Sequence, residues 1–164
     1  MIVIVMGVSG VGKTTVGLLL AKALDAEFAE GDSYHPKANV EKMRCGIPLD
    51  DEDRRPWLET LSAEIGRWLA EERTVVLACS ALKEAYRDIL AAGRQDVHFV
   101  HLEGEEPLLR SRLAQRRGHY MPPGLLSSQL ATLESPKNAI TIDVSCTPEA
   151  IIEQIRAALG RLGD

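Results

Sequence analysis

The feature that most constrains the fold of this chain is a glycine-rich loop directly after its first apolar run. Residues 2–6 are apolar without interruption and are followed by Gly7-Val8-Ser9-Gly10-Val11-Gly12-Lys13-Thr14. Such a run is typical of a strand that is buried on both faces of a parallel sheet. Residues 14–24 then place apolar side chains four positions apart, which predicts a helix with one apolar stripe. The order strand, loop, helix confines the chain to α/β folds whose first loop can bind phosphate.

The residue types in this loop suit a nucleoside triphosphate. Glycines let the backbone approach the phosphates, while successive N–H groups and the helix dipole meet their negative charge. We expect Lys13 to bridge the β- and γ-phosphates and the Thr14 hydroxyl to coordinate Mg²⁺. The alternative is a glycine-rich turn that binds nothing, and the position between a strand and a helix argues against it. The residues expected to contact ATP here are Gly7, Ser9, Gly10, Val11, Gly12, Lys13, Thr14 and Thr15.

The rest of the chain alternates between the two kinds of element. Strands are predicted at residues 26–30, 74–78, 97–102 and 139–144, and helices at 54–71, 81–92, 107–117, 125–133 and from Pro148 onward. Right-handed crossovers then give a three-layer α/β/α domain with a parallel sheet of about five strands. The irregular stretches 33–53 and 117–124 are long for connections, so we interpret them as a substrate clamp and a lid.

Charge and composition exclude several classes of protein. The 164 residues carry a formal net charge of −5, which argues against coating nucleic acid. Residues 1–6 are too short to span a bilayer and lack the features of a secretory signal, so a cytoplasmic protein without a membrane partner is expected. The cysteines Cys45, Cys79 and Cys146 are odd in number and widely spaced, which predicts neither disulfides nor a zinc site. The oligomeric state is not fixed by the sequence, and a homodimer stays open.

The glycine-rich loop at residues 7–14, a P-loop, does not by itself identify the phosphate acceptor. It is compatible with a small-molecule kinase, a nucleotide kinase or a nucleotide-gated switch, although the chain has no N-K-x-D sequence to read guanine. No acidic residue of the Walker B kind follows the predicted strand 74–78. The Mg²⁺ ligands beyond Thr14 are therefore incomplete, and Asp32 acting through a water molecule is one candidate.

Longer motifs resemble the gluconokinase family in order and spacing over nearly the whole chain. They are GDSYHPKANVEKM at 31–43, GIPLDDEDRRPWL at 46–58, ACSALK at 78–83, RRGHY at 116–120, and the stretch from Gln129 to Pro136. The resemblance implies a P-loop kinase fold over residues 1–164, with a substrate-binding segment at 31–58 that contains helix of its own and a mobile lid at 117–124. It also implies ATP-dependent phosphorylation of D-gluconate to 6-phosphogluconate. The alternatives are another small-molecule kinase, such as one similar to shikimate kinase, and a regulatory module that binds nucleotide without catalysis.

A polyhydroxy acid needs a cation for its carboxylate and several partners for its hydroxyl groups. Arg54 offers a planar fork to a carboxylate, and Lys83 and Arg87 can flank it. Asp32 and His35 can form hydrogen bonds with hydroxyl groups at the carboxyl edge of the sheet. Asp32 is the best candidate for the general base, because it follows a strand that ends near the P-loop.

Each of these residues also has a structural interpretation. Asp32 can cap a helix or hold a magnesium water, and His35 can shape the turn before a proline. Arg54 can pair with the acidic residues at 50–53 in a solvated cluster. Lys83 and Arg87 are one helical turn apart and can form a solvated helix face.

Arginines precede the predicted lid. Similar kinases carry lid arginines that neutralise the transferred charge, so Arg112 and Arg116 are expected at ATP, with Arg116 as the catalytic lid arginine and Arg117 as a weaker candidate. A solvated face is the alternative for all three. His119 and Tyr120 have no independent chemical argument. Similar kinases build part of the adenine pocket from the loop after the last strand, here residues 145–148.

The remaining aromatic and histidine side chains are interpreted as structural. Trp57 and Trp68 lie eleven residues apart on one predicted helix, which favours core packing over a platform for sugar stacking. His98 and His101 have no metal-ligand spacing with any partner.

Overall fold

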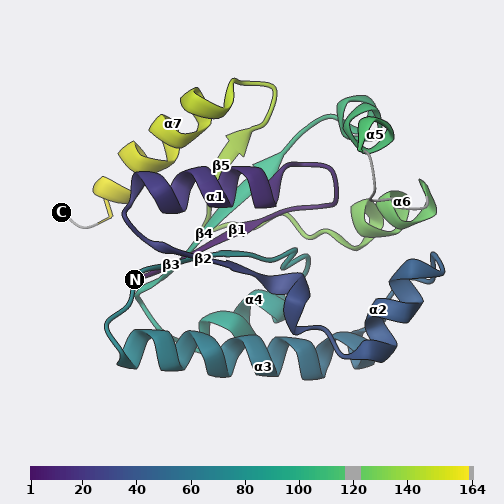
Figure 1. Cartoon of the computed structure of the whole chain (residues 1–164), viewed down its shortest axis with the longest axis horizontal. Coiled ribbons are helices and arrows are strands. Elements are labelled where there is room, and N and C mark those ends of the chain that lie inside the picture. Colours follow the sequence, from purple (N-terminus) through teal and green to yellow (C-terminus); the bar gives the residue numbers. More distant parts are fainter. Residues whose placement is uncertain (117–122, 163–164) are drawn as a thin grey trace.

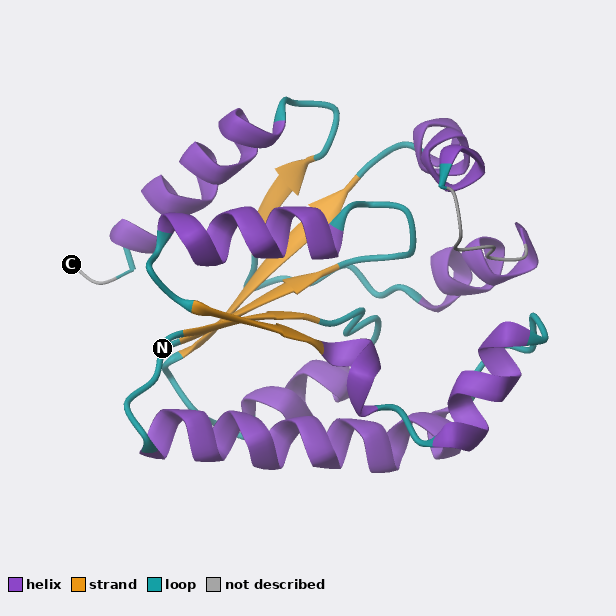
Figure 2. Cartoon of the chain, viewed as in Figure 1, coloured by secondary structure: helices purple, strands orange, loops and turns teal. Residues whose placement is uncertain are grey.

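A five-stranded parallel sheet forms the centre of the computed structural model, which describes residues 1–116 and 123–162 (Figures 1 and 2). Its strands are β1 (Ile2–Met6), β2 (Glu27–Glu30), β3 (Val75–Ala78), β4 (Val97–Glu103) and β5 (Ile140–Asp143). The strand order is β2-β3-β1-β4-β5. In the register, Ile2 of β1 lies opposite Val75 of β3 and Val97 of β4. The predicted parallel sheet of about five strands is confirmed.

Helices cover both faces of the sheet. In Figure 1, α1 (Lys13–Ala23) and α7 (Pro148–Gly160) lie on one face, and α3 (Asp51–Ala70) and α4 (Glu84–Ala91) lie on the other. The 3-10 helix η1 (Gly31–Tyr34), α2 (Lys37–Arg44), α5 (Glu106–Gln115) and α6 (Pro123–Thr132) gather beyond the carboxyl ends of the strands. Open α/β sheets bind ligands at this edge, so these elements surround the expected site.

The core forms where the sequence pattern predicts it. Every residue of β1 has a relative exposure of 0%, because the central strand is covered on both faces. The apolar stripe of α3 is buried against the sheet, and it includes Trp57 and Trp68. Both tryptophans therefore pack in the core as expected. His101 of β4 is buried as well, in agreement with a structural role.

Two helices begin three residues away from their predicted starts. Helix α3 starts at Asp51, three residues before the predicted start, because Asp50 and Asp53 form a reciprocal capping box. Helix α4 starts at Glu84 and not at residue 81. Ala81 has a φ of 45°, in the left-handed region, so the helix cannot include it.

The borders of the predicted lid also differ from expectation. Helix α5 ends at Gln115, and Arg116 is extended with φ −70° and ψ 117°. Pro123 and Gly124, which we expected to be irregular, open helix α6, since proline is well tolerated in the first helical turn. The expected helix within residues 33–53 is confirmed as α2, with η1 directly before it.

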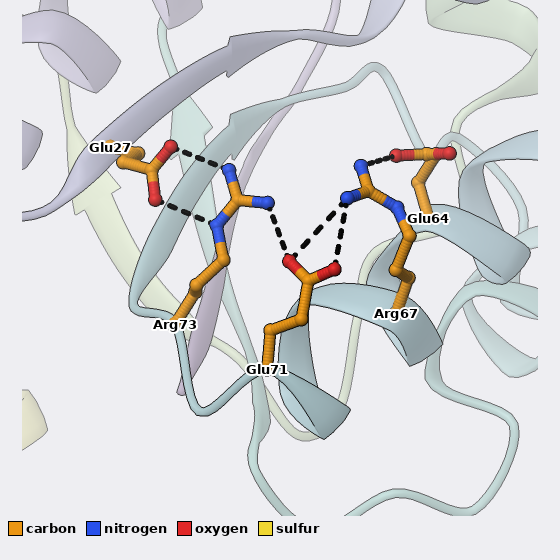
Figure 3. Close-up of polar contacts among 5 residues, drawn as sticks. All are labelled: Glu27, Glu64, Arg67, Glu71 and Arg73. Carbon is orange, nitrogen blue, oxygen red and sulfur yellow. Dashed lines mark hydrogen bonds and ion pairs between the residues drawn. The ribbon is translucent and has the colours of Figure 1, made fainter.

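An ion-pair network ties the end of α3 to the edge strand β2 (Figure 3). Arg73 donates to Glu27 of β2 at 2.7 Å and to Glu71 at 2.9 Å, and Arg67 continues the chain from Glu71 to Glu64. Exposed pairs of this kind contribute little individually to stability. Within 1–116 and 123–162, no helix has the length and apolar character needed to cross a membrane.

Candidate functional site

The P-loop follows the carboxyl end of β1 and leads directly into helix α1. Gly7, Gly10 and Gly12 have φ values of 143°, 84° and 96°, which favour glycine. A Cβ atom on Gly7 would lie 2.6 Å from the carbonyl oxygen of Leu102, so only glycine fits there. Helix α1 begins directly after Gly12, so its positive end points into the loop. The local geometry is therefore that of a phosphate-binding loop.

Two hollows lie on either side of this loop. The first, which we call the Asp32 cleft, includes Ser9, Lys13, Asp32, His35 and Arg54 in its lining. Its remaining lining residues are Met43, Pro48, Leu49, Trp57, Ser80, Leu82, Leu125, Ser128 and Gln129. The cleft combines a phosphate-loop lysine, a carboxylate and a guanidinium, as transfer of a phosphoryl group to an anionic acceptor requires.

The second hollow, which we call the Arg112 hollow, is lined by other residues of the P-loop. The loop contributes Gly10 through Gly12 and Thr15, and helix α5 and its end contribute Arg112 and Arg116. Val144, Cys146 and Pro148 form another wall, where the loop after the last strand was expected. Arg112 is held there by a 2.7 Å hydrogen bond from Nη2 to the carbonyl oxygen of Val144. The hollow therefore brings together part of the P-loop, two arginines and the loop after the last strand, all of which the sequence analysis assigned to ATP.

Lys13 lies on the cleft side of the loop. Its Nζ donates to the carbonyl oxygen of Val8 at 3.1 Å. Burial lowers the pKa of the Lys13 ammonium, and the carboxylates of Asp32 and Glu30 oppose this shift. A partly desolvated cation of this kind interacts strongly with incoming phosphate oxygens.

Thr14 and Glu30 form a pair that the sequence analysis missed. The Thr14 hydroxyl donates to Glu30 Oε2 at 2.7 Å. Mg²⁺ in phosphotransferases is usually held by one or two protein oxygens together with substrate phosphates and water, so this pair fits it. Among the described residues, no cluster of three or more His, Cys, Asp or Glu side chains could hold a metal. The sequence could have indicated Glu30, because it ends the predicted strand 26–30 two residues before Asp32.

Asp32 and His35 are neighbours in the cleft, and His35 packs on Trp57. The side chain of Asp32 is 70% exposed and that of His35 is 3% exposed, with Oδ1 and Nε2 3.8 Å apart. His35 stacks on Trp57, with ring centroids 4.1 Å apart, and Trp57 Nε1 donates to the Gly31 carbonyl at 2.8 Å. Burial lowers the pKa of His35, and the charge of Asp32 opposes the shift. Strand β3 separates β2 from β1, yet the turn through η1 brings Asp32 into the cleft with Lys13.

Arg54 is a buried residue that lines the same cleft. Its Nη1 donates to the Tyr86 hydroxyl at 3.1 Å, and its guanidinium carbon lies 5.5 Å from the centre of the Tyr86 ring. Within the described part of the chain, Arg54 forms no salt bridge, so the solvated acidic cluster proposed as an alternative is not observed. Asp51 of that cluster pairs instead with Lys83 at 2.9 Å and accepts a hydrogen bond from Tyr86. A buried guanidinium without a carboxylate partner is a strong site for an anionic ligand.

Two of the expected acceptor ligands lie elsewhere. Lys83 borders an adjoining open hollow with Asp51 and Arg54, not the Asp32 cleft itself. The expectation that Arg87 flanks the substrate carboxylate is corrected. Arg87 is buried, and its guanidinium donates to the carbonyl oxygens of Ala81, Leu82 and Glu134 at 2.8, 3.2 and 3.0 Å. The Arg87 guanidinium therefore holds the backbone at Leu82, a residue that lines the Asp32 cleft. The sequence shows an arginine one turn after Lys83 but not the carbonyl groups that surround it.

Helix α6 contributes a cleft residue whose role the sequence analysis left open. The backbone N–H and the hydroxyl of Ser9 donate to Gln129 Oε1 at 2.8 and 3.1 Å. Gln129 falls in a motif that carries the family resemblance, although its chemistry could not be assigned from sequence alone. Arg116 lines the Arg112 hollow together with P-loop residues. Arg117, His119, Tyr120 and lid residues 117–122 lie outside the described residues.

The comparisons with known proteins agree with this geometry. A family model described as an AAA domain matches residues 2–136. A thermosensitive gluconokinase of Escherichia coli (strain K12) is 43% identical over 160 residues, covering 95% of this chain and 86% of that protein. A gluconokinase of Gluconobacter oxydans (strain 621H) is 46% identical over 159 residues, covering 93% and 87%. The crystal structure of a gluconokinase from Sinorhizobium meliloti 1021 superimposes with a TM-score of 0.86 at 45% identity, covering 98% and 91%.

Proposed function

Because the chain belongs to the gluconokinase family, we propose that it transfers the terminal phosphate of ATP to D-gluconate and forms 6-phosphogluconate. The observation that carries this proposal is the buried Arg54 guanidinium, which faces the same cleft as Lys13 and Asp32 and has no carboxylate partner among the described residues. A sugar acid supplies that carboxylate at one end and hydroxyl groups at the other.

The two hollows divide the substrates between them. ATP occupies the P-loop and the Arg112 hollow, with its base against the wall formed by Val144 to Pro148. Gluconate occupies the Asp32 cleft, with its carboxylate at Arg54 and its reacting hydroxyl near Asp32. Thr14 and Glu30 would hold the Mg²⁺ that accompanies ATP, and the ion supplies positive charge to the phosphates.

The proposed chemistry is an in-line displacement on the γ-phosphorus. The oxygen of the attacking gluconate hydroxyl forms a bond to phosphorus, and Asp32 accepts the proton of that hydroxyl. The bond from phosphorus to the bridging oxygen breaks, and ADP leaves with the electron pair. Lys13 and Arg116 lie on the two sides of the P-loop, where they stabilise charge on the transferred group.

The wider predictions follow the family. Residues 1–164 are proposed to act as one kinase domain, with the substrate segment at 31–58 and a lid at 117–124. The sheet and both helical layers share one hydrophobic core, which supports this. A cytoplasmic location is proposed, and the free thiols of Cys45, Cys79 and Cys146 agree with it. Assembly into a homodimer stays a prediction.

The substrate is tested by measuring ADP release with a panel of acceptors. The panel contains gluconate, shikimate, other sugar acids and nucleoside monophosphates at equal concentrations. We expect kcat/KM to be highest for gluconate. Faster turnover of any other member would contradict the substrate assignment. Acceptor-independent ATP hydrolysis alone would instead favour the regulatory module.

Replacing Arg54 with glutamine should weaken gluconate binding selectively. Loss of charge-assisted hydrogen bonds to a carboxylate costs about 2 kcal/mol, which corresponds to a rise of about 30-fold in the gluconate KM. The ATP KM should change little, because Arg54 lies in the Asp32 cleft. Arg55→Gln, at the exposed neighbouring position of α3, is the matched control. An unchanged gluconate KM in a folded Arg54→Gln variant would remove Arg54 from the binding site.

A further inference from the structure

Asn39 of α2 is a buried polar residue behind the Asp32 cleft. It has a relative exposure of 3%, and its carboxamide nitrogen contacts two groups at once. Nδ2 donates to the backbone carbonyl oxygen of Asp53 at 2.7 Å and lies 3.2 Å from His35 Nδ1. Buried amides are oriented by their hydrogen-bond partners, so these contacts determine which atoms face each other.

The carbonyl of Asp53 fixes the orientation of the amide. A backbone carbonyl oxygen can only accept a hydrogen bond, so the Asn39 atom that faces it must be the NH₂ group. The same NH₂ group faces His35 Nδ1 and has no lone pair to offer there. His35 Nδ1 must therefore accept, which means that it carries no proton. In a neutral imidazole the proton is then on Nε2.

His35 Nε2 is the ring nitrogen that faces Asp32, at 3.8 Å from Oδ1. Stacking on Trp57 restricts the tilt of the ring. The carbonyl that fixes Asn39 is itself held in place, because the Asp53 carboxylate pairs with Lys42 at 2.8 Å and completes the capping box of α3. A continuous set of contacts thus runs from the start of α3 through Asn39 to the floor of the cleft.

We propose that Asn39 is a positioning residue that holds His35 as the Nε2–H tautomer, so that His35 donates a hydrogen bond in the cleft and does not act as the base. This rests on the proposed function of the cleft. The proton of the attacking hydroxyl goes to Asp32 alone, and His35 Nε2–H orients the Asp32 carboxylate or the acceptor oxygen beside it. Asn39 acts only through His35, since it does not line the cleft.

The tautomer can be measured without any substrate. Long-range ¹H–¹⁵N correlation spectra of the full chain with labelled histidine, recorded where the ring is neutral, distinguish Nε2–H from Nδ1–H. We expect the His35 signals, assigned by their loss in His35→Gln, to show Nε2–H. Asn39→Leu should shift them toward a tautomer mixture, whereas Val40→Ala, at the exposed neighbouring position of α2, should leave them unchanged. An Nδ1–H pattern in the wild type, or no effect of Asn39→Leu, would overturn the proposal.

The kinetic test uses two substitutions of His35. Glutamine can donate a hydrogen bond from a position close to that of Nε2 but cannot accept a proton at neutral pH, while leucine can do neither. With the acceptor that the wild type turns over fastest, we expect His35→Gln to keep kcat within about tenfold of wild type, and His35→Leu to fall at least about tenfold further. Equal losses in two folded variants would overturn the donor role. If the acceptor panel rejects gluconate, the spectra still decide the tautomer, so the two failures can be told apart.

Discussion

Replacing Lys13 with alanine is expected to lower kcat on the order of 10³-fold or more while leaving the chain folded. The Lys13 ammonium is the cation in the Asp32 cleft that comes from the P-loop itself. Transferred phosphoryl groups are stabilised almost entirely by positioned charges, and removing one such charge costs on the order of 10³-fold in kcat. Turnover is measured by ADP release at saturating ATP and gluconate.

The fold should tolerate this change. The hydrogen bond that Lys13 makes to the Val8 carbonyl is local to the loop, and burial already lowers the pKa of its ammonium. Removing a partly desolvated charge relieves an unfavourable term, so Tm should stay the same or rise. Lys22→Ala, at an exposed position on the same helix, should retain full activity. A Lys13→Ala enzyme within tenfold of wild type would show that the P-loop lysine is not required.

The parts of the fold that could be predicted from sequence are those set by local periodicity. The strand at residues 2–6 matched β1 residue for residue, because a buried central strand is apolar on both faces. The starts of α3 and α4 were wrong, because they depend on the capping box of Asp50 and Asp53 and on the left-handed backbone of Ala81. Side-chain capping and single backbone conformations leave no trace in an apolar pattern.

Four residues of the candidate site could be proposed from their chemistry and their position in the sequence. Lys13, Asp32, His35 and Arg54 were each proposed from the chain, and the structure gathers all four in one cleft. Arg87 was misassigned, because an arginine that binds carbonyl groups is indistinguishable in sequence from one that binds a carboxylate.

Contacts across long stretches of chain were beyond prediction for a different reason. Ser9 and Gln129 are separated by 120 positions, and their hydrogen bonds depend on how α6 packs beside the P-loop. The link from Asp53 through Asn39 to His35 likewise needs α2 placed against the first turn of α3. Resemblance to a family can mark such residues, but only their geometry indicates what they do.

Replacing Asp32 with asparagine is expected to lower kcat by a factor on the order of 10² or more, with little change in the gluconate KM. Asparagine has the same shape as aspartate and keeps a side-chain oxygen that can accept a hydrogen bond, but it cannot take a proton from the attacking hydroxyl. The Asp32 side chain is 70% exposed, so the substitution should not destabilise the fold. The measurement is the separate dependence of rate on gluconate and on ATP.

The division between kcat and KM decides the role of Asp32. A base is needed only in the transition state, so its loss lowers kcat and kcat/KM together, whereas loss of a binding group raises KM with kcat unchanged. Asp25→Asn makes the same chemical change at an exposed turn with φ 51°, a conformation that asparagine tolerates, and should have no effect. A gluconate KM that rises in Asp32→Asn at constant kcat would reduce Asp32 to a binding residue. Because the tautomer of His35 leaves no unprotonated nitrogen facing the cleft, proton acceptance would then have to fall to a phosphate oxygen of ATP itself.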